Sequence, residues 1–234
     1  MTHDDEDVLA LPLWINGHAY LTMTDAFFDV TNPKTGEVLR RTPLCGADAA
    51  ATAVSAAQAA LPAWACLSDG ARAALLLPVA DTLEGYAAHF AALIVAETGK
   101  DESAAAAEVA AAVALLRGTP TPSSSGGVIA LVNDDREPLL GLLAQAIPAL
   151  LCGATVVAKP SPKAPSAAFA FAELTARAAL PGGVFNIVQG DQEAIEGLCA
   201  QPAVARLAFA GDAALGEKIR AIAERHGKDF VSRK

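Results

Sequence analysis

The chain has 234 residues, of which 53% are hydrophobic and 18% charged, so it can bury a sizeable core and is not an intrinsically disordered chain. Its formal net charge of −9 argues against a surface for nucleic acid or anionic membrane, because phosphates require a basic footprint. No apolar run approaches the ~20 residues of a membrane span, and the acidic start does not resemble a signal peptide. The four cysteines lack metal-ligand spacing. We therefore expect a cytoplasmic protein with reduced thiols and no metal site.

The first half of the chain predicts short strands and then helices. Residues 1–11 are expected to form a disordered acidic tail, and two apolar runs around Asn16-Gly17 predict a β-hairpin. Two more strands are predicted on either side of a turn, over residues 27–30 and 37–43. Alanine-rich segments with apolar residues at helical spacing predict helices over 47–60, 68–84, 86–97 and 103–117. Residues 12–117 are thus a hairpin and helical part.

Residues 118–127 are rich in Gly, Pro, Ser and Thr, which predicts a flexible joint. After the joint, buried-type strands alternate with helices. The strands are predicted over 128–132, 155–158, 184–188 and 206–209, and the helices over 139–151, 165–179, 193–200 and 212–225. This alternation predicts Rossmann-like βα units, in a doubly wound parallel α/β sheet, over residues 128–234. We take residues 12–234 as a single domain, whose ligands would bind at the carboxyl ends of the strands.

Several ordered motifs carry a family resemblance. They are WING at 14–17, NPKTGEV at 32–38, ETGK at 97–100, IPALLCGATVVAKPS at 147–161 and LPGGVFNIV at 180–188. With them the chain resembles the N-terminal, NAD(P)-binding half of the aldehyde dehydrogenase superfamily. It is also similar to the truncated aldehyde-dehydrogenase-like domain of long proline-utilisation proteins. The resemblance implies a Rossmann-like cofactor domain. It also implies that the nucleophile belongs to a second half that these residues do not contain.

The resemblance assigns a cofactor site to Lys159, Ser161, Gly190 and Gly211. Lys159 matches the family lysine that contacts the adenosine ribose. Gly211 belongs to the motif at the start of a helix, whose N-terminus receives the pyrophosphate in the family. Around this site the chain departs from the family at several positions, and a long β-flap expected between residues 117 and 128 looks deleted.

Three departures affect the chemistry directly. Arg136 stands where the family has an asparagine that donates to the oxyanion, and arginine is longer and permanently charged. Pro162 replaces an acidic residue that often accepts from the ribose. Asp212 replaces a serine beside the pyrophosphate, so a carboxylate would repel that group. A fourth departure, Glu196, stands where the family has a glycine. We therefore expect no cofactor, or NAD(P) bound weakly at most.

Other candidate groups have a structural interpretation. Cys45, Cys66, Cys152 and Cys199 lie mostly in helical or apolar context, where a free cysteine behaves as a small buried hydrophobe. The four histidines, His3, His18, His89 and His226, are not paired with a serine or cysteine. Residues 134–137 (DDRE) are either a new acid–base or metal cluster or a solvated turn, and we favour the turn.

The favoured function is an aldehyde-dehydrogenase-like protein that lacks the nucleophile-bearing domain, is inactive alone and acts through protein contacts. The partner would be a full-length aldehyde dehydrogenase relative or a second copy in a homodimer. The main alternative is the NAD(P)-binding subunit of an aldehyde dehydrogenase, an oxidoreductase whose catalytic half comes from another chain. A nucleotide-binding module without chemistry and a gene remnant that still folds also remain open.

Overall fold

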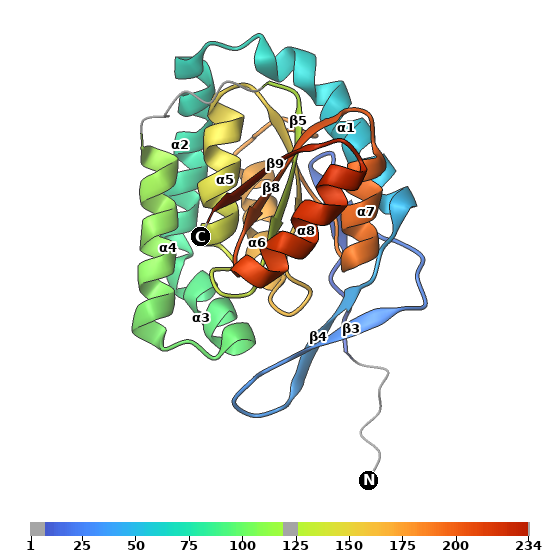
Figure 1. The fold of residues 1–234 in the computed structure, drawn as a ribbon. Helices are drawn as coiled ribbons and strands as arrows, with labels where there is room; N and C mark the ends of the chain where they lie inside the picture. Colours follow the sequence, from blue (N-terminus) through green and yellow to red (C-terminus); the bar gives the residue numbers. More distant parts are fainter. Residues whose placement is uncertain (1–7, 119–125, 234) are drawn as a thin grey trace.

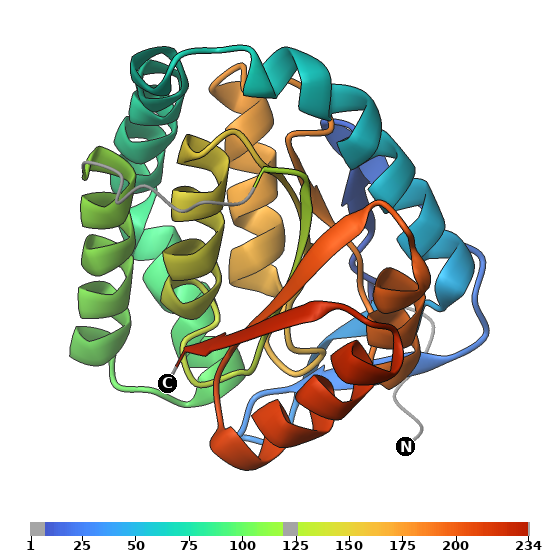
Figure 2. The same ribbon diagram turned by 45° about the horizontal axis from the view of Figure 1, so that its top comes forward.

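The computed structural model describes residues 8–118 and 126–233. The first seven residues of the expected tail and most of the expected joint lie outside the described residues. The described residues form a mainly parallel sheet with helices on both faces (Figures 1 and 2). This confirms the predicted α/β, Rossmann-like fold.

Among the described residues, five parallel strands make up most of the sheet, in the order β7-β6-β5-β8-β9, with β9 at one edge. They are β5 (Val128–Asn133), β6 (Thr155–Lys159), β7 (Phe185–Ile187), β8 (Val204–Ala210) and β9 (Asp229–Arg233). The four predicted strands are all present. The fifth, β9, was not predicted, because its short sequence mixes charged and apolar residues and only its pairing with β8 makes it a strand.

The N-terminal hairpin belongs to the same sheet. Strands β1 (Leu13–Ile15) and β2 (His18–Tyr20) pair around Asn16-Gly17, as predicted, and Trp14 of β1 pairs antiparallel with Ile187 of β7. The backbone N–H of Asn16 also donates to Oδ1 of Asn186 at 3.0 Å. Over residues 8–118 and 126–233 the sheet therefore has seven strands, in the order β2-β1-β7-β6-β5-β8-β9.

Each face of the sheet has its own apolar core. Alternate residues of β5 point to opposite faces, as the pleat of a strand requires. Ile129 and Leu131 pack with α2 to α6, whereas Val128, Ala130 and Val132 pack with α1, α7 and α8. The helices on the first face are α2 (Asp69–Gly85), α3 (Ala87–Thr98), α4 (Glu102–Arg117), α5 (Leu140–Leu151) and α6 (Ser166–Arg177). Those on the second are α1 (Ala47–Ala65), α7 (Gln192–Ala200) and α8 (Ala213–Arg225).

Helix α1 is longer than predicted. Alanine periodicity suggested an end near residue 60, but the helix continues through Pro62 to Ala65. Trp64 explains the extension, because its side chain is 1% exposed and its Nε1 donates to the carbonyl of Leu150 at 2.9 Å. Burying this large ring against α5 holds the last turn of α1 in place.

Strands β3 (Phe27–Thr31) and β4 (Val38–Pro43) form a separate two-stranded arm that projects from the body (Figure 1). Residues 9–11, which we expected to be part of a disordered tail, run beside this arm. The N–H of Leu11 donates to the carbonyl of Arg41 at 2.9 Å, and the N–H of Arg41 donates to that of Leu9 at 3.0 Å. Backbone pairing with a distant strand therefore orders them. Among the described residues, no helix has the length and apolarity to cross a membrane.

Candidate functional site

The loop that follows β5 meets the start of α8 at the carboxyl end of the sheet. Asn133, the last residue of β5, donates its side-chain amide to the carbonyls of Asp134 and Pro138, at 3.0 and 3.3 Å. These bonds close the loop and hold Asp134 beneath it, where the residue is 8% exposed. Arg136 and Glu137 are exposed in a bend, as the expected solvated turn requires, whereas the Asp134 side chain is built into the protein.

Asp134 organises this end of the sheet. Its carboxylate accepts hydrogen bonds from Nε and the backbone N–H of Arg136, at 2.9 and 3.0 Å, and from the backbone N–H of Asp212 at 2.8 Å. Gly211 lies against the same carboxylate. Its φ of 149° favours glycine, and a Cβ added there would lie 2.5 Å from the Asp134 carboxyl group. Any side chain at residue 211 would push the two loops apart.

The N-terminus of α8 is capped by Asp212. Its carboxylate accepts from the backbone N–H groups of Ala214 and Leu215, at 2.8 and 3.3 Å. These bonds lower the pKa of Asp212, and the nearby Arg136 guanidinium, 3.9 Å away, contributes further. The N–H groups that an anion would use at this helix end therefore already face a carboxylate of the chain itself.

Lys159 lies at the carboxyl end of β6 and is buried at 3% exposure. Its Nζ donates to the carbonyls of Pro160 and Gly190, both at 2.8 Å, so two of the predicted cofactor residues meet here. Burial lowers the pKa of Lys159 to about 8, partly opposed by the charge of Asp191. The φ of Gly190 is 135°, and an added Cβ would lie 2.8 Å from the carbonyl oxygen of Cys45. The ammonium group thus binds backbone carbonyls of the chain itself.

Ser161 and Pro162 continue this segment. Ser161 is buried, and its Oγ accepts from the N–H of Lys163 at 3.3 Å. The carbonyl of Pro162 accepts from Oγ1 of Thr42 at 2.8 Å, which ties the segment to the base of the arm. Both residues therefore have structural contacts, and neither contacts the Asp134 cluster in any interaction we find among the described residues.

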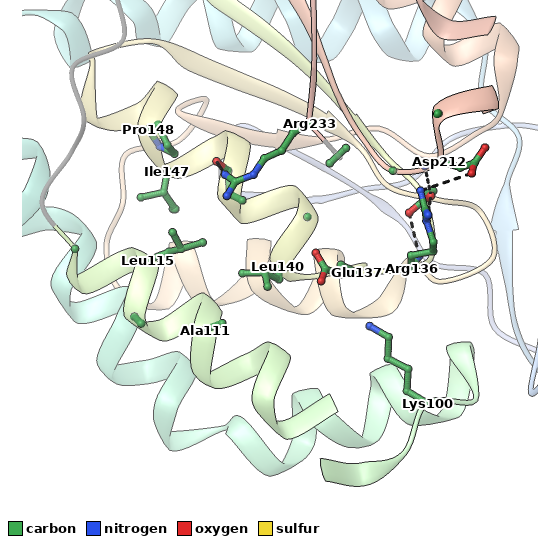
Figure 3. A pocket seen from close by; sticks show the side chains of 18 of the residues that line it. Lys100, Ala111, Leu115, Arg136, Glu137, Leu140, Ile147, Pro148, Asp212 and Arg233 are labelled. Atoms are coloured by element: carbon green, nitrogen blue, oxygen red, sulfur yellow. Dashed lines mark hydrogen bonds and ion pairs between the residues drawn. The ribbon is translucent and has the colours of Figure 1, made fainter. Parts of the chain in front are cut away.

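A cavity of about 1260 Å³ lies between α4, α5 and the ends of β8 and β9 (Figure 3). Arg136, Gly211 and Asp212 line its polar end, whereas Lys159, Ser161, Pro162 and Gly190 do not line it. Its walls are apolar along the two helices and charged at the rim. The labelled wall and rim residues are Ala111, Leu115, Leu140, Ile147, Pro148, Lys100, Glu137 and Arg233. The predicted cofactor residues therefore fall into two groups: Gly211 lines the cavity, whereas Lys159, Ser161 and Gly190 lie away from its lining.

Two buried polar residues near the site were missed from the sequence. Glu108 of α4 accepts from the backbone N–H groups of Leu139 and Leu140, at 3.0 and 3.1 Å, and pairs with Nζ of Lys100. It thereby caps α5 from another helix, and no local motif indicates such a contact. Gln189 is fully buried, and neither polar atom of its side chain has a hydrogen-bond partner among the described residues.

The cysteines and histidines do not assemble a reactive centre in the described part of the chain. Burial raises the pKa of Cys45, and it raises that of Cys199 to about 11, whereas a nucleophilic thiol needs a lowered pKa. His226 pairs with Glu196 at 2.9 Å, which links α8 to α7. No group of three or more His, Cys, Asp or Glu residues that could hold a metal ion occurs within residues 8–118 and 126–233.

Known proteins are similar to this chain in sequence and in fold. The sequence profile described as "Aldehyde dehydrogenase family" matches residues 20–122 and 126–232. A malonate-semialdehyde dehydrogenase of Pseudomonas aeruginosa is 34% identical, over 86% of this chain and 44% of its own length. An NADP(+) succinate-semialdehyde dehydrogenase of Escherichia coli is 31% identical, over 94% of this chain and 50% of its own. The crystal structure of Escherichia coli lactaldehyde dehydrogenase superposes with a TM-score of 0.89 at 31% identity, covering 96% of this chain and 52% of that one.

Each of these matches covers only part of the related protein. The chain spans about half the length of the curated relatives it matches, and the resemblance places that half at their N-terminus. Within it, the profile covers nearly every described strand and helix. The chain therefore belongs to the aldehyde dehydrogenase family and corresponds to the N-terminal half of its longer members.

Proposed function

We propose that this chain does not itself oxidise aldehydes and that it acts through protein contacts. The observation that carries the proposal is the capped N-terminus of α8, where the Asp212 carboxylate already accepts from two backbone N–H groups. The family resemblance implies that the pyrophosphate of NAD(P) would occupy this helix end. A fixed carboxylate a few ångströms from a diphosphate opposes its binding, because like charges repel each other.

The other residues of the cofactor site fit NAD(P) no better. The ammonium group of Lys159 is buried and donates to two backbone carbonyls, so contact with a ribose would require it to leave these partners. Pro162 offers no side-chain acceptor, and its carbonyl is used by Thr42. Each such loss amounts to about 1–3 kcal/mol, which together would move a micromolar site into the millimolar range.

Arg136 also argues against oxyanion chemistry. Its Nε and backbone N–H are both held by Asp134, and its guanidinium lies 3.9 Å from Asp212. An oxyanion hole needs donors aimed at the developing charge, whereas these donors are turned towards carboxylates. The matched relatives carry dehydrogenase names, but Arg136 and its partners argue against oxyanion chemistry in this chain.

The test is titration with NADH and NADPH, followed by calorimetry, together with an assay for NAD(P)-dependent aldehyde oxidation. The unmodified chain should show no saturable binding below about 1 mM and no oxidation above the blank. Asp212→Ser should gain affinity, because it removes the charge but keeps a capping oxygen. Glu217→Ser is the matched control, since it removes one negative charge from the exposed surface of the same helix without touching the cap.

Two outcomes would overturn the proposal. Tight binding of NAD(P) by the unmodified chain would mean that the capped helix end still accepts a diphosphate. Equal gains from Asp212→Ser and Glu217→Ser would mean that net charge, and not the occupied helix end, weakens the site. Either result would favour the alternative function, in which the chain is the NAD(P)-binding subunit of an aldehyde dehydrogenase.

A further inference from the structure

Strand β9 is an open edge of the main sheet. It lies last in the strand order, pairs with β8 on one side only, and no described element lies outside it (Figure 2). Its residues are largely exposed, and Val231 keeps 48% of its surface accessible. An exposed edge strand with a free row of backbone groups is a template for pairing with another strand.

The backbone of β9 shows which residues would take part. The carbonyl of Arg233 accepts from the N–H of Gly211, which follows β8, so the peptide groups of Arg233 point towards β8. Because successive residues of a strand alternate, Val231 and Asp229 turn the same way. The N–H and C=O groups of Phe230 and Ser232 therefore point outwards.

The side chains of β9 are complementary to a second copy of themselves. In an antiparallel pairing centred on Val231, Val231 faces Val231, Asp229 faces Arg233, and Phe230 faces Ser232. The outward groups of Phe230 and Ser232 then make the hydrogen-bonded pairs. The opposite charges fall at non-hydrogen-bonded positions, where side chains approach most closely.

The faces of the strand agree with such a pairing. Val231 and Arg233 line a hollow on the α5 side, whereas Phe230 lies under Arg220 of α8, whose guanidinium is 5.0 Å from its ring centroid. A two-fold axis perpendicular to the sheet keeps each side chain on its own face. The opposite charges therefore meet on the α5 side of both copies, where within each chain Asp229 also lies 3.8 Å from Arg206 and Arg233 donates to the carbonyl of Ala144.

We propose that the chain forms a two-fold dimer through antiparallel pairing of β9, which joins two sheets into one. The partner is a second copy because β9 is self-complementary: in an antiparallel pair it places Asp229 of each copy opposite Arg233 of the other. Such a pairing has a two-fold axis. The other sheet edge, β2, is three residues long and carries no such pair of charges. This inference names a partner and surface for the contacts assigned under the proposed function.

The first experiment measures mass by sedimentation or light scattering over a dilution series from about 1 to 100 µM. The full chain should reach the mass of two chains at the upper end. Ser232→Pro should remain monomeric throughout, because it removes an outward N–H and sets a ring in the contact. The fold should survive, since proline is tolerated at an edge where the N–H faces solvent. Circular dichroism checks this.

A charge swap tests the register. Asp229→Arg alone and Arg233→Asp alone each place like charges opposite one another, so each should lower the association constant about tenfold or more. The double variant, Asp229→Arg with Arg233→Asp, restores opposite charges and should recover most of the association. Failure of the double variant to recover, in a folded chain, would contradict the pairing.

Cross-linking gives a readout that does not depend on affinity. The α-carbons of a non-hydrogen-bonded antiparallel pair lie about 4.5 Å apart, within the range of a disulfide. In a Cys66→Ser background, which removes the exposed native thiol, Val231→Cys should oxidise to a covalent dimer. Ser232→Cys is the matched control and should not, because its residue faces Phe230 of the other copy.

The outcomes separate this inference from the proposed function. A chain that stays monomeric, or a dimer that tolerates Ser232→Pro, overturns the β9 pairing and leaves the proposed lack of catalysis standing. A β9 dimer that binds NAD(P) tightly and oxidises aldehydes overturns the proposed function and leaves the pairing standing.

Discussion

Single buried charges set much of the chemistry in this protein. Asp134 is satisfied by three donors and pulls the loop after β5 towards α8. Lys159 is satisfied by two backbone carbonyls, yet burial still disfavours its charged form and lowers its pKa to about 8. A residue that the family resemblance assigns to a cofactor is thus a titratable group inside the core.

The lowered pKa of Lys159 predicts a pH-dependent stability. Between about pH 8 and the ordinary lysine pKa of 10.5, the unfolded chain binds more protons than the folded chain, so the free energy of unfolding rises with pH. The rise should be about 1 kcal/mol from pH 8 to pH 9. Lys159→Met should abolish it. Urea denaturation of both chains at several pH values below 9 measures this difference in slope.

The stability measurement is limited to pH values below 9 because a cysteine titrates above that pH. The pKa of Cys199 is raised from 9.0 to about 11, so above pH 9 the folded chain keeps a proton that the unfolded chain loses. Stability then falls with pH and works against the lysine effect. Parallel slopes for the wild type and Lys159→Met below pH 9 would show that Lys159 does not titrate in this range.

At the scale of elements, helix ends are closed by carboxylates from different places. Asp212 caps its own helix, α8, whereas α5 has no capping side chain at its N-cap residue, Leu139. Glu108 of α4 takes that role and also pairs with Lys100. The contact joins α4, α5 and the start of the site loop. The N-terminus of α8 is therefore capped by a residue of its own sequence, whereas the N-terminus of α5 is capped by a residue of another helix.

Removal of the Glu108 cap should destabilise the protein. Glu108→Ala leaves two backbone N–H groups of α5 and one ammonium group without their acceptor, which should cost about 3 kcal/mol of unfolding free energy. Glu108→Gln keeps an acceptor oxygen and should cost less. Glu102→Ala, at an exposed position of the same helix, should change stability by no more than about 0.5 kcal/mol. Equal effects of Glu108→Ala and Glu102→Ala would refute the cap.

At the scale of the whole molecule, a rigid layered body carries a thin arm. Strand β5 lies between β6 and β8 with helices on both faces, whereas β3 and β4 pair with each other and with residues 9–11 (Figure 1). Arg40, in the half of β4 nearer the turn, holds the arm to α3, since its Nε lies 3.1 Å from Oε1 of the buried Glu97. Local opening should therefore begin in the arm and not in the central strands.

Hydrogen exchange measures this difference. Amides of β3 and β4 should be protected at least about a hundredfold less than those of β5, which corresponds to about 3 kcal/mol of opening free energy. Arg40→Ala should lower protection in the arm further and leave β5 unchanged. Equal protection in the arm and in β5 would show that the arm opens only with the whole domain.

The sequence by itself determined what depends on local pattern. Apolar runs of strand length, alanine-rich helical spacing and Asn16-Gly17 predicted the hairpin, the four central strands and all the helices, because burial and turn geometry leave periodic marks in the chain. The family resemblance singled out Lys159 and Gly190, which the structure brings into contact, and marked Arg136 and Asp212 as departures.

Only the tertiary structure decided which segments meet. The pairing of Trp14 with Ile187, the continuation of α1 to bury Trp64, the strand β9 and the Glu108 cap all join residues that are remote in sequence or lack a local signal. The same holds for Asp134, whose carboxylate accepts hydrogen bonds from both Arg136 and Asp212 and so joins these two departures from the family in one cluster. Hydrogen-bond partners are set by packing in three dimensions, and a one-dimensional pattern records how strongly a residue is buried but not what it is buried against.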